Sequence, residues 1–216
     1  IDWHHPDFTI DVNHPRRDDP DARQQNEGRD MHRYAEYMRN QVRELLTNYG
    51  KIDIMWFDFS YSQRHGEGDK AWLGGKGKDD WESEKLIALA RSIQPEIIID
   101  NRTEIEQDLW TPEQFQPTDW FRHPKTGELV VWEACQTLSG SWGYYRDEYT
   151  WKSPEMLIRM LISTVSNGGN LIMNVGPTAR GYLDHRAEDA LKVYADWMKY
   201  NSRSIYGCTK AEPEFK

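Results

Sequence analysis

The segment 52–59, which reads Ile-Asp-Ile-Met-Trp-Phe-Asp-Phe, constrains the fold of this chain more than any other stretch. It begins as an apolar run typical of a strand buried on both faces, yet it ends in aromatic residues and a carboxylate. Because a charge is costly inside such a strand, we expect Asp58 to leave the sheet at the strand's carboxyl end and face a cleft, with Ile52 and Ile54 in the core. An aspartate in this position is also often a turn former or a helix cap, so that interpretation stays open.

Short apolar runs alternate with segments of helical periodicity along the whole chain. Polar residues repeatedly follow the apolar runs, as Arg102 and Glu133 do. This order is typical of a (β/α) barrel or a doubly wound sheet, and the lack of a glycine-rich phosphate loop after any strand favours the barrel. Further strands are predicted at 96–100, 129–132 and 170–175, and helices at 31–49 after a cap at Asp30, at roughly 81–93, from Ser153 to Gly168, and at about 185–200.

The composition narrows the classes of partner. The net charge of −9 and the isoelectric point near 5.3 argue against nucleic acid, because phosphate binding needs a concentrated basic face and the Lys and Arg residues here are scattered. The sequence contains no apolar run long enough to span a membrane, so it predicts no membrane partner. Ten Trp and eleven Tyr are typical of proteins that stack rings against sugars, although large aromatic residues also fill barrel cores.

Three carboxylates are candidates for glycoside cleavage, which needs one carboxylate to attack or assist and one acid to protonate the leaving oxygen. Asp58 has the most favourable predicted position. Glu113 follows Thr111-Pro112, and this sequence is equally typical of a helix start with its usual first-turn acid. Glu133 directly follows a predicted strand, so it is either a catalytic group or an acceptor that holds neighbouring side chains.

Two adjacent histidines and one arginine are candidate ligand-binding residues. His4 and His5 could be metal ligands, but consecutive residues on an extended chain point to opposite faces, and no third and fourth ligand follows at a recognisable spacing. The sequence therefore predicts no metal site. Arg102 could anchor a substrate hydroxyl or pair with Asp58, and a purely structural ion pair is an equally good interpretation.

Six short motifs together resemble a known enzyme family. They resemble, in order and register over nearly the whole chain, the α-L-fucosidases of glycoside hydrolase family 29. The motifs are Ile1-Asp2-Trp3-His4-His5-Pro6-Asp7, Trp56-Phe57-Asp58, Thr111-Pro112-Glu113, Trp132-Glu133-Ala134-Cys135 with Ser141-Trp142-Gly143-Tyr144, Asn174-Val175-Gly176-Pro177-Thr178 and Asn201-Ser202-Arg203-Ser204-Ile205-Tyr206-Gly207.

The resemblance implies a fold and a reaction. The fold would be a partial (β/α)8 TIM-like barrel over residues 1–216, the C-terminal portion of a catalytic barrel, with the upstream strands and a C-terminal β-sandwich absent. The reaction would be that of a retaining exo-glycosidase that releases L-fucose from α-L-fucosides by double displacement, without a cofactor. The family's His-His-Asp-Gly-Phe segment is missing here, so we expect the chain alone to be inactive.

The resemblance also assigns roles to residues of this sequence. Asp58 would be the nucleophile and Glu113 the acid/base, with Glu133 as the competing acid/base. The positions that would contact the sugar are Trp56, Arg102, Trp142, His4 and His5.

The partner implied is a fucosylated oligosaccharide or glycoconjugate, and the location implied is periplasmic, secreted or lysosomal; the sequence predicts no oligomeric state. Two other interpretations stay open. One is a non-catalytic, carbohydrate-binding barrel fragment, and the other is a metal-dependent barrel hydrolase that uses the two adjacent histidines.

Overall fold

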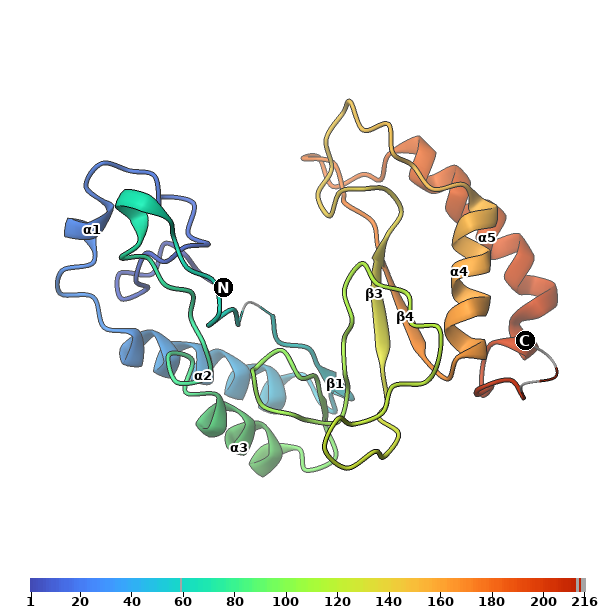
Figure 1. The fold of residues 1–216 in the computed structure, drawn as a ribbon, viewed down its shortest axis with the longest axis horizontal. Helices are drawn as coiled ribbons and strands as arrows, with labels where there is room; N and C mark the ends of the chain where they lie inside the picture. Colours follow the sequence, from blue (N-terminus) through green and yellow to red (C-terminus); the bar gives the residue numbers. More distant parts are fainter. Residues whose placement is uncertain (59, 213, 215–216) are drawn as a thin grey trace. The chain divides into compact units, whose positions relative to one another are not determined.

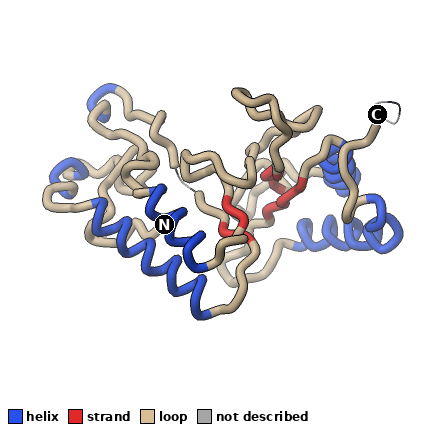
Figure 2. The backbone as a smooth tube through the Cα atoms, turned by 90° about the horizontal axis from the view of Figure 1, so that it is seen from below, coloured by secondary structure: helices blue, strands red, loops and turns tan. Residues whose placement is uncertain are grey.

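The structure is a computed structural model, and it describes residues 1–58, 60–212 and 214 of the 216-residue chain. Phe59, the last residue of the segment 52–59, lies outside the described residues. The chain divides into two compact units, Ile1–Asp108 and Leu109–Lys216. Each unit contains one pair of parallel strands with helices packed nearby, and long loops make up much of the rest (Figures 1 and 2).

The helices of the first unit begin and end close to the predicted residues. Helix α2, Met31–Asn48, begins after Asp30, whose carboxylate accepts the N–H of His32 as an N-cap does. Gly50 follows with φ +81°, a left-handed conformation that glycine adopts without strain. Helix α3, Ser83–Ile93, packs against α2. Two short helices, α1 at Ala22–Gln25 and the 3-10 helix η1 at Gly68–Lys70, lie in the loops.

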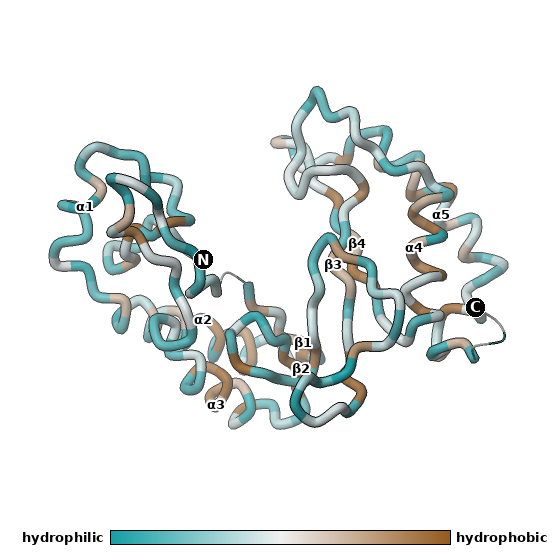
Figure 3. Tube along the Cα trace, in the orientation of Figure 1, coloured by the Kyte–Doolittle hydropathy of each residue, from teal (hydrophilic) through white to brown (hydrophobic). Residues whose placement is uncertain are grey.

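The first strand pair is shorter than the sequence predicts. Strand β1, Ile54–Met55, pairs in parallel with β2, Ile98–Ile99. Side chains alternate along a strand, so Met55 and Ile99 face the two helices while Ile54 lies on the other face, 47% exposed. The prediction that Ile54 lies in the core is therefore wrong. Figure 3 shows hydrophobic residues along α3 and the strand pair, where the buried cluster consists of Val42, Leu46, Leu86, Ala90, Ile97 and Ile99.

A buried ion pair joins the two long loops of the first unit. The ammonium of Lys76 lies 2.7 Å from Asp11 Oδ2 and 2.6 Å from the carbonyl oxygen of Thr9, and it sits 4.2 Å from the centre of the Phe8 ring. Lys76 and Asp11 are both buried. A buried charge is tolerated only when it is paired and hydrogen-bonded, so this contact ties the loop around residue 76 to the loop around residue 11.

The second unit has a longer strand pair. Strand β3, Glu133–Thr137, pairs in parallel with β4, Asn170–Asn174. Residues 110–114 run parallel to β3 and to the residue before it, with bridges from Trp110 to Trp132 and from Glu113 to Cys135. The predicted bounds 129–132 are wrong, because the strand begins at Glu133, where the apolar run ends. Within the run, Leu129 and Val130 pair with residues 121–122, whereas Val131 and Trp132 pair with Trp110.

Two helices accompany the second strand pair. Helix α4, Pro154–Ser166, begins after Ser153, whose hydroxyl accepts the N–H of Met156, as predicted. Helix α5, His185–Asn201, is capped by the carboxylate of Asp184 and continues into the 3-10 helix η2, Ser202–Ser204. The core between the helices and β4 contains Leu138, Leu157, Ala187 and Ala190. Among the described residues, no helix combines the length and the apolar character needed to cross a membrane.

Candidate active site

Asp58, Arg102 and Trp56 come together in the first unit. Asp58 follows β1 and Arg102 follows β2, and because the strands are parallel and in register their carboxyl ends meet at one edge. The Arg102 guanidinium donates from Nη1 to Asp58 Oδ1 over 3.1 Å, and its Cζ lies 4.6 Å from the centre of the Trp56 ring. The sequence prediction that Asp58 and Arg102 lie at strand carboxyl ends is confirmed.

Asp100 is a buried carboxylic acid behind this pair. It follows β2 directly, is fully buried, and its Oδ1 accepts the backbone N–H of Arg102 over 3.0 Å. Its Oδ2 has no hydrogen-bond partner in the described part of the chain. Burial raises the pKa of Asp100 to about 7, against the opposing effects of hydrogen bonds and of the Arg102 charge. Asp100 is therefore largely protonated in mildly acidic solution, where it holds the turn that carries Arg102 without adding a charge.

A pocket opens next to Asp58 within the first unit. Its polar lining comes from the loops after β1 and β2 and from the start of α3, and its apolar lining comes from the two helices and the chain start. It encloses about 310 Å³, part of it open to solvent. The side chain of Asp58 is 40% exposed, whereas that of Arg102 is 14% exposed. The lining residues are Ile1, Met38, Phe57, Asp58, Ser60, Trp81, Ser83, Leu86, Arg102 and Thr103.

Glu113 and Glu133 both lie on the sheet of the second unit. Glu113 sits in the extended segment opposite Cys135, so the helix-cap interpretation of its motif is wrong. Glu133 is the first residue of β3, so the expectation that it follows a strand is also wrong. Each residue advances a strand by about 3.3 Å, which puts Glu113 roughly 7 Å nearer the carboxyl end than Glu133. Glu113 is exposed and Glu133 is half-buried.

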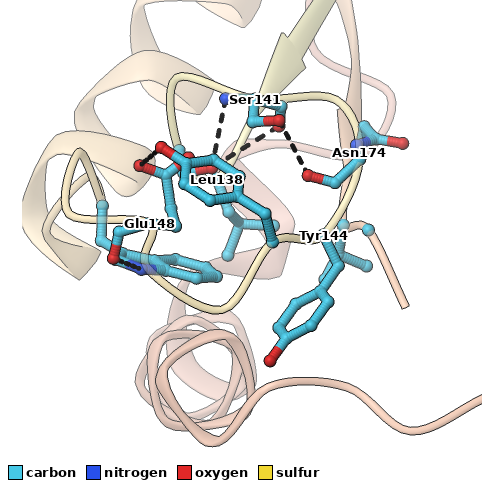
Figure 4. A pocket seen from close by; sticks show the side chains of 11 residues that line it. Leu138, Ser141, Tyr144, Glu148 and Asn174 are labelled. Atoms are coloured by element: carbon cyan, nitrogen blue, oxygen red, sulfur yellow. Dashed lines mark hydrogen bonds between the residues drawn. The ribbon is translucent and has the colours of Figure 1, made fainter. Parts of the chain in front are cut away.

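Trp142 lies on the loop that follows β3. Its side chain is 42% exposed, and its carbonyl oxygen accepts the side-chain N–H of Asn174, the last residue of β4, over 2.7 Å. Gly176 allows the two segments to approach closely, because a Cβ at this position would lie 2.5 Å from the backbone nitrogen of Tyr144. The base of the loop surrounds a small pocket in which Leu138, Ser141, Tyr144, Glu148 and Asn174 gather (Figure 4). The loop is therefore fixed to the carboxyl end of β4.

Glu148 also stabilises the loop that follows β3. Its Oε1 accepts both the N–H and the hydroxyl of Thr150, and Thr150 Oγ1 accepts the N–H of Gly140. These hydrogen bonds, first that of the Thr150 hydroxyl, lower the pKa of Glu148 to about 2. This carboxylate is used for holding the loop, which makes it a poor candidate for a general acid.

The two predicted histidines have different surroundings. His4 is exposed, whereas the ring of His5 lies 4.5 Å from that of Tyr37 and its Nδ1 accepts the N–H of Asp7. The two side chains do not face a common point with a third ligand, since residues 1–58, 60–212 and 214 contain no group of three or more His, Cys, Asp or Glu that could hold a metal ion. Their role as sugar contacts stays a prediction.

Sequence reasoning did not single out Asp100, Trp81 or Ser83. Asp100 ends an apolar run as Asp58 does, so the criterion that identified Asp58 could have identified it too. Trp81 and Ser83 lie at the start of α3, and no pattern in the sequence predicts that a helix start borders the pocket of Asp58. The convergence of Asp58 with Glu113 and Trp142, which belong to the second unit, stays a prediction.

Comparisons with known proteins agree on one family. A family model described as alpha-L-fucosidase matches residues 1–203. The plasma alpha-L-fucosidase of Pongo abelii is 30% identical over 172 residues, which are 76% of this chain and 33% of that protein. The alpha-L-fucosidase of Dictyostelium discoideum is 26% identical over 177 residues, 80% of this chain and 35% of that protein. The chain thus spans about a third of the length of these curated relatives.

Solved structures give the same result. Alpha-L-fucosidase isoenzyme 1 from Paenibacillus thiaminolyticus is 38% identical and superimposes with a TM-score of 0.82, covering 98% of this chain and 49% of that one. A Thermotoga maritima alpha-fucosidase in complex with fucose is 26% identical, with a TM-score of 0.61, and covers 83% of this chain and 36% of that one.

Proposed function

The chain belongs to the α-L-fucosidase family of glycoside hydrolases, and from this premise we propose that the protein hydrolyses α-L-fucosides with retention of configuration. The observation that carries the proposal is the hydrogen-bonded pair of Asp58 and Arg102 beside an open pocket at the carboxyl ends of two parallel strands. Such ends are where barrel enzymes place their reacting groups. The substrate would be a fucosylated oligosaccharide or glycoconjugate.

Asp58 is the proposed nucleophile. Its carboxylate would attack the anomeric carbon, and the bond to the aglycone oxygen would break as a glycosyl-enzyme ester forms. The hydrogen bond from Arg102 fixes one carboxylate oxygen of Asp58 at 3.1 Å.

Glu113 is the proposed acid/base, with Glu133 as the alternative. The acid would protonate the leaving oxygen in the first step, and as a base it would then activate the water that releases fucose. A retaining reaction needs the two carboxyl groups about 5 Å apart. Greater exposure and a position nearer the carboxyl end of the sheet favour Glu113 over Glu133.

The remaining assignments extend the same proposal. Trp56, packed on Arg102, and Trp142, held by Asn174, would offer ring faces to the apolar face and methyl group of fucose, and His4 and His5 would supply further polar contacts. The two units would be parts of one (β/α)8 barrel. Relatives named plasma and tissue alpha-L-fucosidase support a secreted or lysosomal protein, with a periplasmic one as the bacterial equivalent.

The test compares single variants in the full-length protein with an aryl α-L-fucoside as substrate. Asp58→Gly should abolish turnover, and added azide should restore it as a fucosyl azide of inverted configuration, because azide then replaces the missing nucleophile. Asp53→Gly is the matched control, since Asp53 lies before β1, is 72% exposed and pairs with Lys51. If Asp58→Gly keeps its turnover, the proposed mechanism is wrong.

A second comparison separates the two acid/base candidates. Glu113→Ala should spare the first step with an aryl leaving group, which needs little protonation, and should slow the second step so that the covalent intermediate accumulates. Azide should then give the product of retained configuration. If Glu133→Ala shows this behaviour and Glu113→Ala does not, Glu133 is the acid/base. Sugar binding without turnover in the wild-type protein would instead indicate a non-catalytic carbohydrate-binding protein.

A further inference from the structure

Polar side-chain atoms without hydrogen-bond partners gather in the pocket beside Asp58. The indole Nε1 of Trp81, the hydroxyl of Ser83 and the hydroxyl of Ser60 are buried, and none has a partner in the described part of the chain. All three residues line the pocket that contains Asp58 and Arg102. Trp81 is 6% exposed and Ser83 is 1% exposed, so the two side chains point into the protein rather than into bulk water.

An unpaired buried polar atom is unfavourable by about 1–3 kcal/mol, and native proteins contain few of them. Ser92, an exposed residue near the carboxyl end of α3, donates to the carbonyl oxygen of Leu89 over 2.7 Å, whereas the buried hydroxyl of Ser83, the first residue of the helix, has no partner in the described part of the chain. Three unpaired atoms around one open pocket indicate that their partners belong to a ligand.

The chemistry of the lining restricts the ligand. Trp81 and Arg102 offer only donors and the Asp58 carboxylate offers only acceptors, while serine hydroxyls do both. The carboxylate disfavours an anion and the guanidinium disfavours a cation, so neutral hydroxyl groups, which donate and accept, fit best. The remaining wall includes the apolar side chains of Met38 and Leu86, which suit a C–H face or a methyl group.

We propose that Trp81 and Ser83, together with Ser60, bind hydroxyl groups of the sugar that Asp58 attacks and thereby determine which sugar the pocket accepts. The inference rests on the proposed function, because it takes the sugar to be the substrate of Asp58. It adds three groups to a site otherwise built from strand ends. The Trp81 indole N–H and the Ser83 hydroxyl lie near the start of α3, and the Ser60 hydroxyl lies after β1. These groups are binding residues, not reacting ones.

The experiment measures the Kd for L-fucose and the melting temperature of Trp81→Phe and Ser83→Ala in the full-length protein. Each variant should weaken fucose binding about tenfold, the effect expected when a buried donor or hydroxyl to the ligand is lost. Ser83→Ala should not lower the melting temperature, because its hydroxyl has no hydrogen-bond partner in the described part of the chain, whereas Trp81→Phe should lower it somewhat, because it also removes ring atoms packed against Phe8 and Tyr34. Ser92→Ala is the matched control on the same helix, and its Kd should equal that of the wild type.

A panel of monodeoxy methyl α-L-fucosides identifies the hydroxyl that each residue contacts. For the sugar that lacks that hydroxyl, the variant should bind as well as the wild type, because the interaction is already gone. A residue that only supports the fold would weaken all the sugars equally. Loss of the deoxy-specific pattern, or a Kd within twofold of the wild type in both variants, overturns the inference.

Turnover of an aryl α-L-fucoside by the wild-type protein separates this inference from the proposed function. If the wild type turns over and both variants bind fucose normally, the inference fails and the proposed function stands. If fucose binding depends on Trp81 and Ser83 but no turnover occurs, the sugar site is supported and the proposed reaction is wrong. A wild-type protein that neither binds fucose nor turns over overturns both.

Discussion

Replacing Asp100 by Asn should change how the stability of the protein depends on pH. In the folded protein Asp100 is fully buried and has a pKa of about 7, raised by burial from its ordinary value of 3.8. Between these two values the folded protein holds a proton that the unfolded chain has lost. The free energy of unfolding of the wild type therefore falls as pH rises through this window. Asn cannot titrate, and its carbonyl oxygen can accept the N–H of Arg102 as Asp100 Oδ1 does.

The expected size of the effect follows from the width of the window. Each pH unit between about 4 and 7 should remove about 1.4 kcal/mol of the stability that Asp100 contributes, on the order of 4 kcal/mol in all. Above pH 7 the loss should level off, because both states are then ionised. Asp100→Asn should thus lose less stability than the wild type as the pH rises from about 4 to 7, and the difference between their free energies of unfolding should grow from pH 5 to pH 7.

Urea unfolding of both proteins at half-unit steps from pH 4.5 to 8 gives the required difference. Any constant offset from burying an amide in place of an acid cancels in the change with pH. Ser92→Ala, in which neither side chain titrates, serves as the control and should run parallel to the wild type. A difference between Asp100→Asn and the wild type that stays constant over this range would refute the reasoning, since Asp100 would then be ionised and paired in the folded protein throughout.

Three other predictions concern stability. Gly168→Ala should lower the free energy of unfolding by about 3 kcal/mol, because the new Cβ would lie 2.3 Å from an indole ring and φ is +80°. Gly28→Ala, at the same φ but with no atom of the described residues within 4 Å, should lower it by only about 1 kcal/mol, and equal losses in urea unfolding would contradict this. Lys76→Met should lower the free energy of unfolding by about 3–5 kcal/mol, because it leaves the buried carboxylate of Asp11 unpaired. The double variant Lys76→Met, Asp11→Leu should recover most of this loss, and a double variant as unstable as the single one would contradict the prediction. Hydrogen bonds from the side chains of Lys85 and Arg39 hold the pKa of Glu82 at about 2, so the stability that its carboxylate contributes should be lost as the pH falls from about 4.5 to 2. In Glu82→Gln, the free energy of unfolding should not show this part of the fall with pH.

Local sequence was sufficient for the helix starts and for the position of the central pair. The caps at Asp30 and Ser153 could be predicted because a cap bonds to backbone only two or three residues away. The placement of Asp58 and Arg102 followed from a comparably local rule, since a charged residue cannot continue a buried strand and must leave it at the carboxyl end. The motifs around these residues also identified the family that the comparisons later matched.

Burial and pairing between distant segments depended on the tertiary structure. Strand β3 reads Glu-Ala-Cys-Gln-Thr and carries little apolar signal, but β4 on one side and residues 110–114 on the other satisfy its backbone hydrogen bonds. Ile54 has the composition of a core residue and lies on the exposed face of β1. In both cases a neighbour far away in the sequence, not the residue's own character, determines the environment.

The raised pKa of Asp100 and the pocket of Trp81 and Ser83 have the same origin. The sequence by itself determined that an acid follows β2 and that a serine begins α3. Only the packing of these segments decided that the acid loses its contact with water and that the serine lines the pocket of Asp58, with a hydroxyl that has no partner in the described part of the chain. Desolvation depends on every atom that surrounds a group, and those atoms are contributed by segments whose contact the one-dimensional pattern does not encode.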